Sequence, residues 1–242
     1  MGQTNLTEQL TAHSNGRRWA LLLPAMLLPA VGSVFYFHLW HGTTAANLLY
    51  SGVKLFTVVY PVICAVWLLR IPLPFKGQSL RFHIRAVPAG IVLGLAIVGV
   101  AIVLLQTPLG PVVIESAGTM REHLAGTMWL NHFIPLALAL SLVHSLIEEV
   151  YWRWFVYGQL CLLIPKGWAL ILGGLAFSLH HVVVLLQFFE PAVALPFSAC
   201  VGIGGVFWSL MMDRQKTLAG AWISHLVVDL GMFGIGYWLL FC

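Results

Sequence analysis

Charged residues are scarce in this sequence, and their scarcity decides the class of protein. Asp, Glu, Lys and Arg together make up 8% of the 242 residues, whereas 60% of the residues are hydrophobic. The hydrophobic residues form long runs that no soluble core of this size requires. We therefore predict an all-α fold, a polytopic transmembrane helix bundle of about seven spans embedded in the lipid bilayer.

The sequence also lacks the patterns of several other classes. Its four cysteines show no CxxC spacing, which argues against a zinc knuckle and against a disulfide framework. Leu6 stands where an N-myristoylation signal requires Ser or Thr. The net charge of +4 comes from basic residues in short connections between apolar runs, so no nucleic-acid partner is expected.

The apolar runs divide the chain into three parts. Residues 1–18 are polar and are predicted to form a flexible cytoplasmic tail, residues 19–127 hold the first three spans with their connecting loops, and residues 128–242 hold four more. Lys54 lies inside the second span and is predicted to snorkel to the membrane surface. A short interfacial helix is expected between residues 106 and 127. The predicted spans are 19–37, 47–69, 87–105, 128–147, 168–189, 192–212 and 217 or 218 to 241.

The basic residues orient the bundle, because an excess of Lys and Arg marks cytoplasmic connections. We expect an integral multi-pass membrane protein with a cytoplasmic N-terminus and an external C-terminus, as in a bacterial inner membrane. In this orientation the outer connections contain only Arg121. The inner connections contain Arg17, Arg18, Arg70, Lys76, Arg81, Arg85, Arg153, Lys166, Arg214 and Lys216.

Glu148, Glu149 and Arg153 place three charges within six positions at the end of the fourth apolar run. A charge at the bilayer centre costs about 2.5–3.5 kcal/mol on insertion scales, so such residues usually face the protein interior and serve function. Because residues four apart share a helical face, Glu149 can pair with Arg153, whereas Glu148 continues a polar stripe that includes His144. A salt-bridged helix end at the membrane surface is the alternative interpretation.

Two later spans carry further ionisable groups. The fifth contains His180 and His181, and the seventh contains His225 and Asp229, which are four apart and so lie on one helical face. Groups of this kind need partners in hydrocarbon. We therefore expect them to form one buried polar cluster with Glu148.

The motifs Glu148-Glu149-x-x-x-Arg153, Phe177-x-x-x-His181 and His225-x-x-x-Asp229 lie in this order on successive spans. In this arrangement they resemble the CPBP family of intramembrane proteases, which includes the CAAX-processing Rce1 proteases and many bacterial Abi proteins. The resemblance extends from the fourth span to the end, which makes residues 128–242 the expected catalytic core. It implies an endopeptidase that cleaves a membrane-associated protein or peptide near its membrane end or C-terminus.

The resemblance also implies roles for four residues. Glu148 and His181 would activate a water molecule, while His225 and Asp229 would assist the oxyanion. An ionised aspartate cannot donate a hydrogen bond to an oxyanion. Asp229 is therefore expected to orient His225 so that the imidazole donates instead.

Three further residues are expected to support this machinery. Glu149 and Arg153 would hold the helix in place, and His180 would be an adjacent decoy or a supporting donor. No cofactor is expected, and the HExxH motif of many zinc proteases is absent. Two histidines and a glutamate are nevertheless a common set of zinc ligands, so a zinc-dependent protease with the same residues is an alternative. A transporter, or a non-catalytic scaffold or immunity protein, could use the same cluster for protons or for folding, but no internal repeat typical of transporters is visible.

Overall fold

The computed structural model describes residues 2–69 and 79–242, with side chains from residue 15 onward, and every regular element in these ranges is a helix. Arg70 and Lys76, counted above among the inner connections, lie outside the described residues. Seven helices are long and apolar enough to cross a membrane, which confirms the predicted all-α bundle of seven spans. These spans are Asn15–Leu39, Thr44–Leu69, Leu80–Leu104, Phe133–Leu160, Lys166–Leu185, Pro191–Gln215 and Ala219–Phe241.

Several spans combine α-helical with π-helical or shorter segments. Span one consists of α1 (Gly2–Val34) and η1 (Phe35–Leu39), and span two consists of α2 (Thr44–Ile63) and η2 (Cys64–Leu69). Span three joins α3 (Leu80–Ile84) to α4 (Val87–Leu104), and spans five, six and seven are α10 (Lys166–Leu185), α11 (Pro191–Gln215) and α12 (Ala219–Phe241). Between spans three and four lie α5 (Leu109–Leu124), the helix expected in that connection, and α6 (Met128–Asn131).

Span four does not end at the glutamates. It runs through α7 (Phe133–Ala139), η3 (Leu140–His144), α8 (Ser145–Glu149), η4 (Val150–Tyr157) and α9 (Gly158–Leu160). The prediction that span four ends at residue 147 is therefore wrong. Arg153 is 1% exposed and lies inside the bundle rather than in an inner connection. The span can continue because the buried side chains of Glu149 and Arg153 carry opposite charges and pair with each other.

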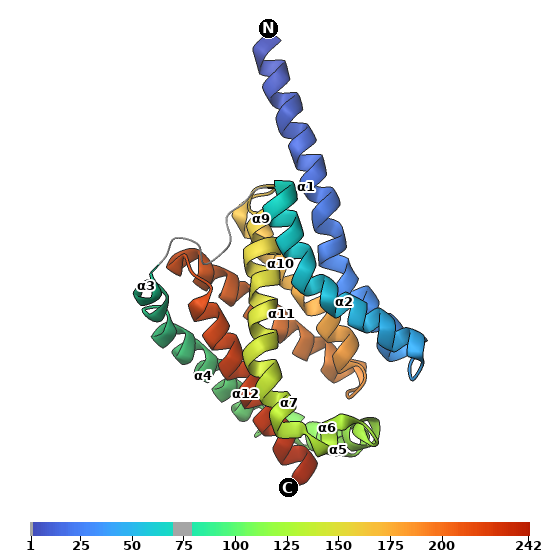
Figure 1. Cartoon of the computed structure of the whole chain (residues 1–242). Helices are drawn as coiled ribbons and strands as arrows, with labels where there is room; N and C mark the ends of the chain where they lie inside the picture. Colours follow the sequence, from blue (N-terminus) through green and yellow to red (C-terminus); the bar gives the residue numbers. More distant parts are fainter. Residues whose placement is uncertain (1, 70–78) are drawn as a thin grey trace.

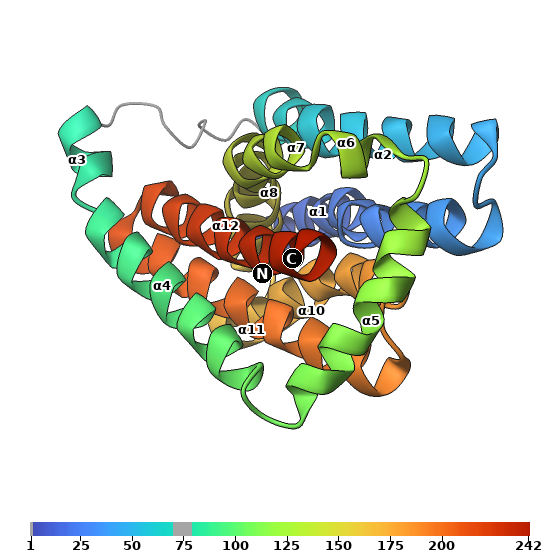
Figure 2. The same cartoon turned by 90° about the horizontal axis from the view of Figure 1, so that it is seen from below.

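The two ends of the chain lie at opposite ends of the bundle, as an odd number of spans requires (Figure 1). At the N-terminal end, α1 begins at Gly2, so the polar segment predicted as a flexible tail is helical in the structure. Figure 1 shows span four near the centre, with α1 and α2 on one side and α4 and α12 on the other. The main helix pairs are α4 with α12, α10 with α11, and α1 with α10 (Figure 2).

Glycines permit the closest of these helix contacts. The spacing of small residues in α11 predicts close packing, and a Cβ atom added at Gly174 of α10 would lie 2.8 Å from the carbonyl oxygen of Gly202 in α11. Likewise, a Cβ atom added at Gly90 of α4 would lie 2.4 Å from the carbonyl oxygen of Gly220 in α12. Small residues of this kind let helix backbones approach closely inside a membrane.

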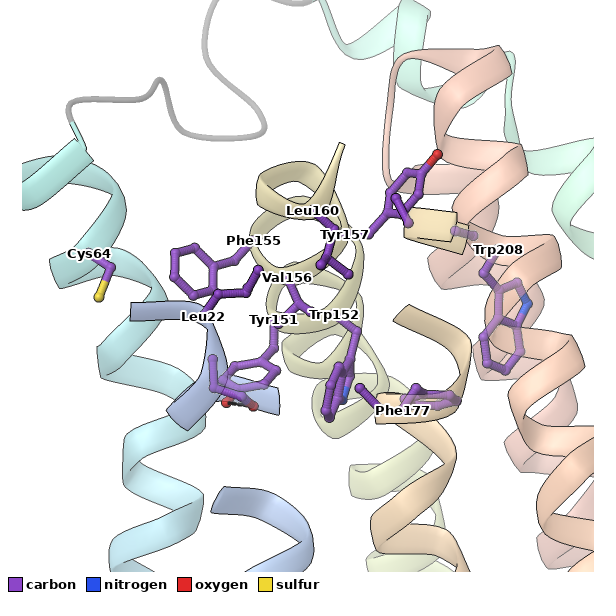
Figure 3. Close-up of a cluster of buried hydrophobic side chains, with 14 residues drawn as sticks. Leu22, Cys64, Tyr151, Trp152, Phe155, Val156, Tyr157, Leu160, Phe177 and Trp208 are labelled. Atoms are coloured by element: carbon purple, nitrogen blue, oxygen red, sulfur yellow. Dashed lines mark hydrogen bonds between the residues drawn. The ribbon is translucent and has the colours of Figure 1, made fainter. Parts of the chain in front are cut away.

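The principal apolar core surrounds η4 and joins the first two spans to span four (Figure 3). Tyr151 and Phe155 of η4 pack with Leu22 of α1 and Cys64 of η2 in this core. The Tyr151 hydroxyl donates to the carbonyl oxygen of Ala25 at 2.6 Å. Spans one and two, which carry no recognisable motif, are thereby fixed beside the helix that carries the glutamates.

Candidate active site

Glu148 lies deep in the membrane-spanning part of the bundle. It is 12 positions before Leu160 and 15 positions after Phe133, the two ends of span four (160 − 148 and 148 − 133). At 1.5 Å per residue, these separations correspond to about 18 Å and 22 Å. The sequence-based expectation that Glu148 sits at the cytoplasmic end of its span is therefore wrong. At 8% exposure, its carboxylate is buried among polar partners.

Three imidazoles surround the Glu148 carboxylate. Its Oε1 atom lies 3.4 Å from Nε2 of His144 and 3.3 Å from Nε2 of His180. Its Oε2 atom lies 3.7 Å from Nε2 of His225. These rings come from span four itself, from α10 and from α12, so the predicted convergence of the three motif-bearing spans is confirmed.

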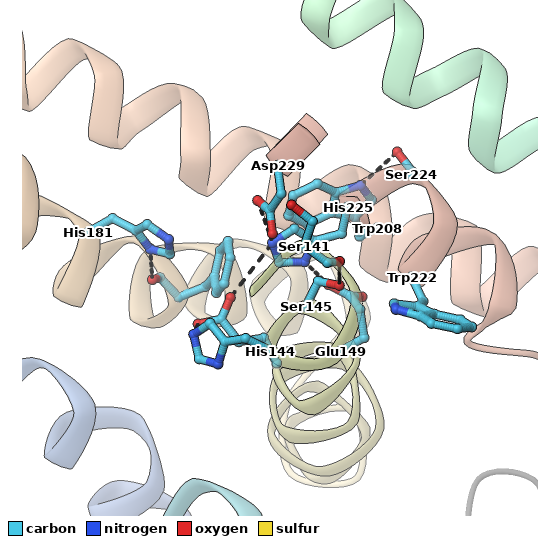
Figure 4. A network of polar contacts seen from close by, with 12 residues as sticks. Ser141, His144, Ser145, Glu149, His181, Trp208, Trp222, Ser224, His225 and Asp229 are labelled. Carbon is cyan, nitrogen blue, oxygen red and sulfur yellow. Dashed lines mark hydrogen bonds and ion pairs between the residues drawn. The ribbon is translucent and has the colours of Figure 1, made fainter. Parts of the chain in front are cut away.

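His180 and His181 both lie beside Glu148, in different ways. His180, expected to be a decoy or a supporting donor, makes the direct contact with the Glu148 carboxylate. The Nδ1 atom of His181 lies 3.1 Å from the carbonyl oxygen of Phe177, so this nitrogen donates and the ring's Nε2 atom carries the lone pair (Figure 4). One nitrogen of each histidine and one carboxylate oxygen of Glu148 lie within 4.8 Å of one another.

The third motif places His225 between carboxylates. Its Nδ1 atom lies 2.8 Å from Oε1 of Glu149, and its Nε2 atom lies 3.6 Å from Oδ1 of Asp229. Because a carboxylate only accepts, Nδ1 of His225 donates to Glu149. The residue that holds the ring is thus Glu149, whereas the sequence interpretation assigned that role to Asp229. Figure 4 shows His225 and Asp229 pointing toward the helix that carries Glu149.

The order and convergence of these motifs agree with a known family. Residues 130–231 match the family described as Type II CAAX prenyl endopeptidase Rce1-like. The match includes every motif residue from Glu148 to Asp229, and it confirms the resemblance drawn from the sequence. It supports, in general terms, an intramembrane endopeptidase of the CAAX type that acts on membrane-associated peptides. No curated protein and no solved structure matches the chain.

The Rce1-like region also contains a buried ion pair. Nε of Arg153 lies 3.3 Å from Oε2 of Glu149, and both side chains are almost fully buried. The terminal guanidinium nitrogens of Arg153 have no hydrogen-bond partner among the described residues. Instead, the guanidinium carbon lies 4.3 Å from the centre of the Phe177 ring and 5.0 Å from that of Trp208. Cation–π contacts therefore supplement the single carboxylate.

Trp208 of α11 is a part of the Rce1-like site that the sequence did not indicate. Its ring stacks on His225, with ring centres 4.2 Å apart and ring planes inclined by 13°. The indole N–H donates to the hydroxyl of Ser224 at 2.9 Å, which fixes the ring (Figure 4). No charge or motif in span six points to this contact, so composition alone could not have identified it.

A cavity of about 380 Å³, its open mouth included, lies beside the Glu148 carboxylate. The Rce1-like region supplies one side of it from span four and from His180. The other side comes from α1 and α2, outside the matched region. On that side Lys54 of α2 is 3.3 Å from Nε2 of His144. The lining residues are Pro29, Ser33, Tyr50, Val53, Lys54, Thr57, His144, Ile147, Glu148, Tyr151, Trp152 and His180.

Proposed function

We propose that this protein is an intramembrane endopeptidase in which Glu148 is the general base. It hydrolyses a peptide bond near the membrane end or the C-terminus of a membrane-associated substrate. The observation that carries the proposal is a carboxylate in mid-span, ringed by imidazoles from three helices and bordering a cavity. Ionisable groups are rare in hydrocarbon, and a cluster of this kind is typical of a functional site.

The first step activates a water molecule between Glu148 and His181. Because Nδ1 of His181 donates to the Phe177 carbonyl, the free lone pair on Nε2 can accept one proton of a bound water, and the Glu148 carboxylate can accept the other. One ring nitrogen of His181 lies within 4.8 Å of a carboxylate oxygen of Glu148, a separation that a single water can bridge. Glu148 then takes a proton as the water oxygen attacks the peptide carbonyl. When the tetrahedral intermediate collapses, the C–N bond breaks and Glu148 returns the proton to the leaving amine. The imidazole of His180 donates to Glu148 and holds its side chain.

The second element is stabilisation of the oxyanion by His225. Its Nδ1–H is committed to Glu149, so Nε2 can donate only when the ring is doubly protonated. The carboxylates of Glu149 and Asp229 lie beside the two ring nitrogens and would balance that charge. Asp229 assists through charge and not as a donor. Such preorganised charges act more strongly in a site that excludes bulk water.

The direct test is cleavage of a prenylated peptide by the purified protein in lipid nanodiscs. We expect Glu148→Gln and His181→Ala each to reduce kcat by at least about 100-fold, because general base catalysis contributes roughly 10²–10⁴-fold. Glu122→Gln is the matched control, because Glu122 is exposed on α5 outside the spans. Folded wild-type protein that does not cleave prenylated or unprenylated membrane-anchored peptides would contradict the proposal and favour a scaffold or immunity role.

A zinc-dependent protease is the second candidate, favoured by the cluster of Glu148, His180 and His181. A glutamate with two histidines is a donor set that zinc proteases use, and the Phe177 carbonyl orients the His181 ring as a supporting hydrogen bond to a ligand would. A zinc ion held there would polarise the peptide carbonyl and activate water. Stoichiometric zinc in the purified protein, lost together with activity on chelation, would establish this candidate. Full activity in metal-free protein would exclude it.

A further inference from the structure

Lys54 lies in the middle of a membrane span, although the sequence predicted that it would snorkel to the surface. It is 10 positions after Thr44 and 15 positions before Leu69 (54 − 44 and 69 − 54). These separations are about 15 Å and 22 Å along the helix. The ammonium group turns inward, where Nζ lies 3.3 Å from Nε2 of His144 and 5.2 Å from the centre of the Tyr50 ring. A partly buried cation at this depth in a membrane span needs a functional explanation.

The partners of Lys54 do not satisfy its ammonium group. An ammonium has three N–H donors and the imidazole of His144 can accept one of them. Among the described residues, no carboxylate lies within 4.0 Å of Lys54 Nζ. Tyr50 offers only the face of its ring. The ammonium therefore keeps donors available on the wall of the cavity that contains Glu148.

A direct ion pair with Glu148 does not account for the position of Lys54. Nε2 of His144 is 3.3 Å from Lys54 Nζ and 3.4 Å from Oε1 of Glu148. A single imidazole nitrogen either accepts a hydrogen bond or donates one, so it cannot join the ammonium and the carboxylate at the same time. The ammonium and the carboxylate thus lie beside the same imidazole nitrogen, and among the described residues they form no ion pair within 4.0 Å.

We propose that Lys54 is a substrate-binding residue that selects peptides with an anionic oxygen group close to the scissile bond. This proposal rests on the proposed endopeptidase function and deepens it. The anionic group is a carboxylate of the substrate, either at its free C-terminus or on an acidic side chain. A lipid headgroup does not fit, because it lies at the surface of a hydrocarbon core about 30 Å thick and Lys54 lies near mid-span.

The geometry gives this selection a physical basis. A charged ammonium that donates to a carboxylate forms a short, strong hydrogen bond, and the surrounding hydrocarbon strengthens the attraction. The same donors gain much less from a neutral amide. Because Lys54 and Glu148 line the same cavity, a substrate carboxylate held by Lys54 would place the preceding peptide bond within reach of Glu148.

The test measures binding, so it does not depend on turnover. Glu148→Gln protein in phosphatidylcholine nanodiscs is titrated with one fluorescent prenylated peptide in three forms: a free C-terminal acid, its amide, and the amide with a terminal Glu. We expect at least one of the two carboxylate forms to bind at least tenfold more tightly than the plain amide. Lys54→Met should remove the preference and Lys54→Arg should keep it. Glu122→Gln, on α5 outside the spans and away from the cavity, is the control.

Two results would overturn the proposal. Equal affinity for all three peptides in the Glu148→Gln parent would show that Lys54 selects no anion, and this comparison needs no further variant to fold. A preference that persists in folded Lys54→Met protein would assign the selection to another group. Neither result bears on whether the wild-type protein cleaves peptides, so failure of this proposal is distinct from failure of the proposed function.

Discussion

The Nδ1 atom of His225 lies 2.8 Å from Oε1 of Glu149, and the other carboxylate oxygen of Glu149 lies 3.3 Å from Nε of Arg153. Glu149 therefore has two tasks, one for the fold and one for the site. Its pairing with Arg153 allows span four to continue through the bilayer. Its bond to His225 holds the ring whose Nε2 atom faces Glu148. Variants can separate these tasks.

Arg153→Met should destabilise the protein by about 3–5 kcal/mol, because it leaves Glu149 buried without its cation. The double variant Arg153→Met with Glu149→Met should recover much of this loss, since apolar residues often replace a buried ion pair without cost. Thermal melting in detergent measures both changes. The double variant should nevertheless remain inactive, because Nδ1 of His225 then has no acceptor.

An active double variant would contradict this account, because it would show that His225 needs no partner at Nδ1. A single variant Arg153→Met with normal melting but no turnover would instead give Arg153 a direct role in catalysis. The first outcome concerns the partner of His225 and the second concerns the role of Arg153, so melting and turnover are measured for both variants.

Gly205→Ala should destabilise the bundle by about 1–3 kcal/mol through overpacking. A Cβ atom added there would lie 3.0 Å from Cδ1 of Phe177 and 3.3 Å from Nη2 of Arg153. Gly204→Ala on the same helix is the matched control, since its Cβ atom would meet only the Trp208 ring at 3.8 Å. Melting temperatures of the two variants should differ accordingly. If they fell equally, loss of glycine in general, and not crowding of Arg153, would be the cause.

The sequence was sufficient to predict the seven spans, because each apolar run has the length that a membrane requires. It was also sufficient to predict the polar cluster, because ionisable groups in hydrocarbon must find one another. It misplaced the end of span four, because Glu148, Glu149 and Arg153 looked like a helix end. Whether such charges are exposed or mutually buried depends on neighbouring helices, and a single sequence does not specify which helices are neighbours.

The partners of individual side chains were harder to predict than the cluster. His144 stands four positions before Glu148, so helical spacing already indicated their contact. Lys54 and Trp208 reach the site from spans two and six, and only the packing of those helices directs them inward. The choice of His180 as the direct partner of Glu148 depends on the rotation of α10, which two adjacent histidines leave undetermined.

Trp208→Leu should reduce turnover by about tenfold or more, whereas Trp208→Phe should retain most of it. Phenylalanine keeps an aromatic face against His225 and near Arg153, but it lacks the N–H that donates to Ser224. Leucine lacks both, and cation–π and stacking contacts are each worth about 0.5–2 kcal/mol. Cleavage of a prenylated peptide measures the difference. Equal activity of the two variants would show that stacking on His225 does not contribute.

The orientation of the bundle is tested with single cysteines in a background without the four native ones. Glu190→Cys, between α10 and α11, should react with a membrane-impermeant thiol reagent in intact cells, as the cytoplasmic N-terminus requires. Gly167→Cys, at the opposite end of α10, should react only after the membrane is permeabilised. Both positions are exposed in the structure. The reverse pattern would place the N-terminus outside.

The side from which water and substrate reach Glu148 follows from the shape of the cavity. The central depth of Glu148 in span four does not by itself select a side. The cavity-lining residues Ser33 and Tyr50 lie six positions from Leu39 and Thr44, the span ends that flank the turn between spans one and two (39 − 33 and 50 − 44). The cavity therefore extends from Glu148 toward that turn.

Thr57→Cys, which lines the cavity, should consequently be labelled from the same side of the membrane as Glu190→Cys. The α10–α11 connection and the turn between α1 and α2 lie at the same end of the bundle, so this expectation holds for either orientation (Figure 1). Cysteines at Ser145 or Ser224 would not report on access to the cavity, because both positions are 0% exposed and a thiol reagent could not reach them. Labelling of Thr57→Cys only from the side that exposes Gly167→Cys would mean that the cavity opens toward the opposite membrane face. The substrate would then have to enter past the apolar core around Tyr151 and Phe155, a path that this packing closes.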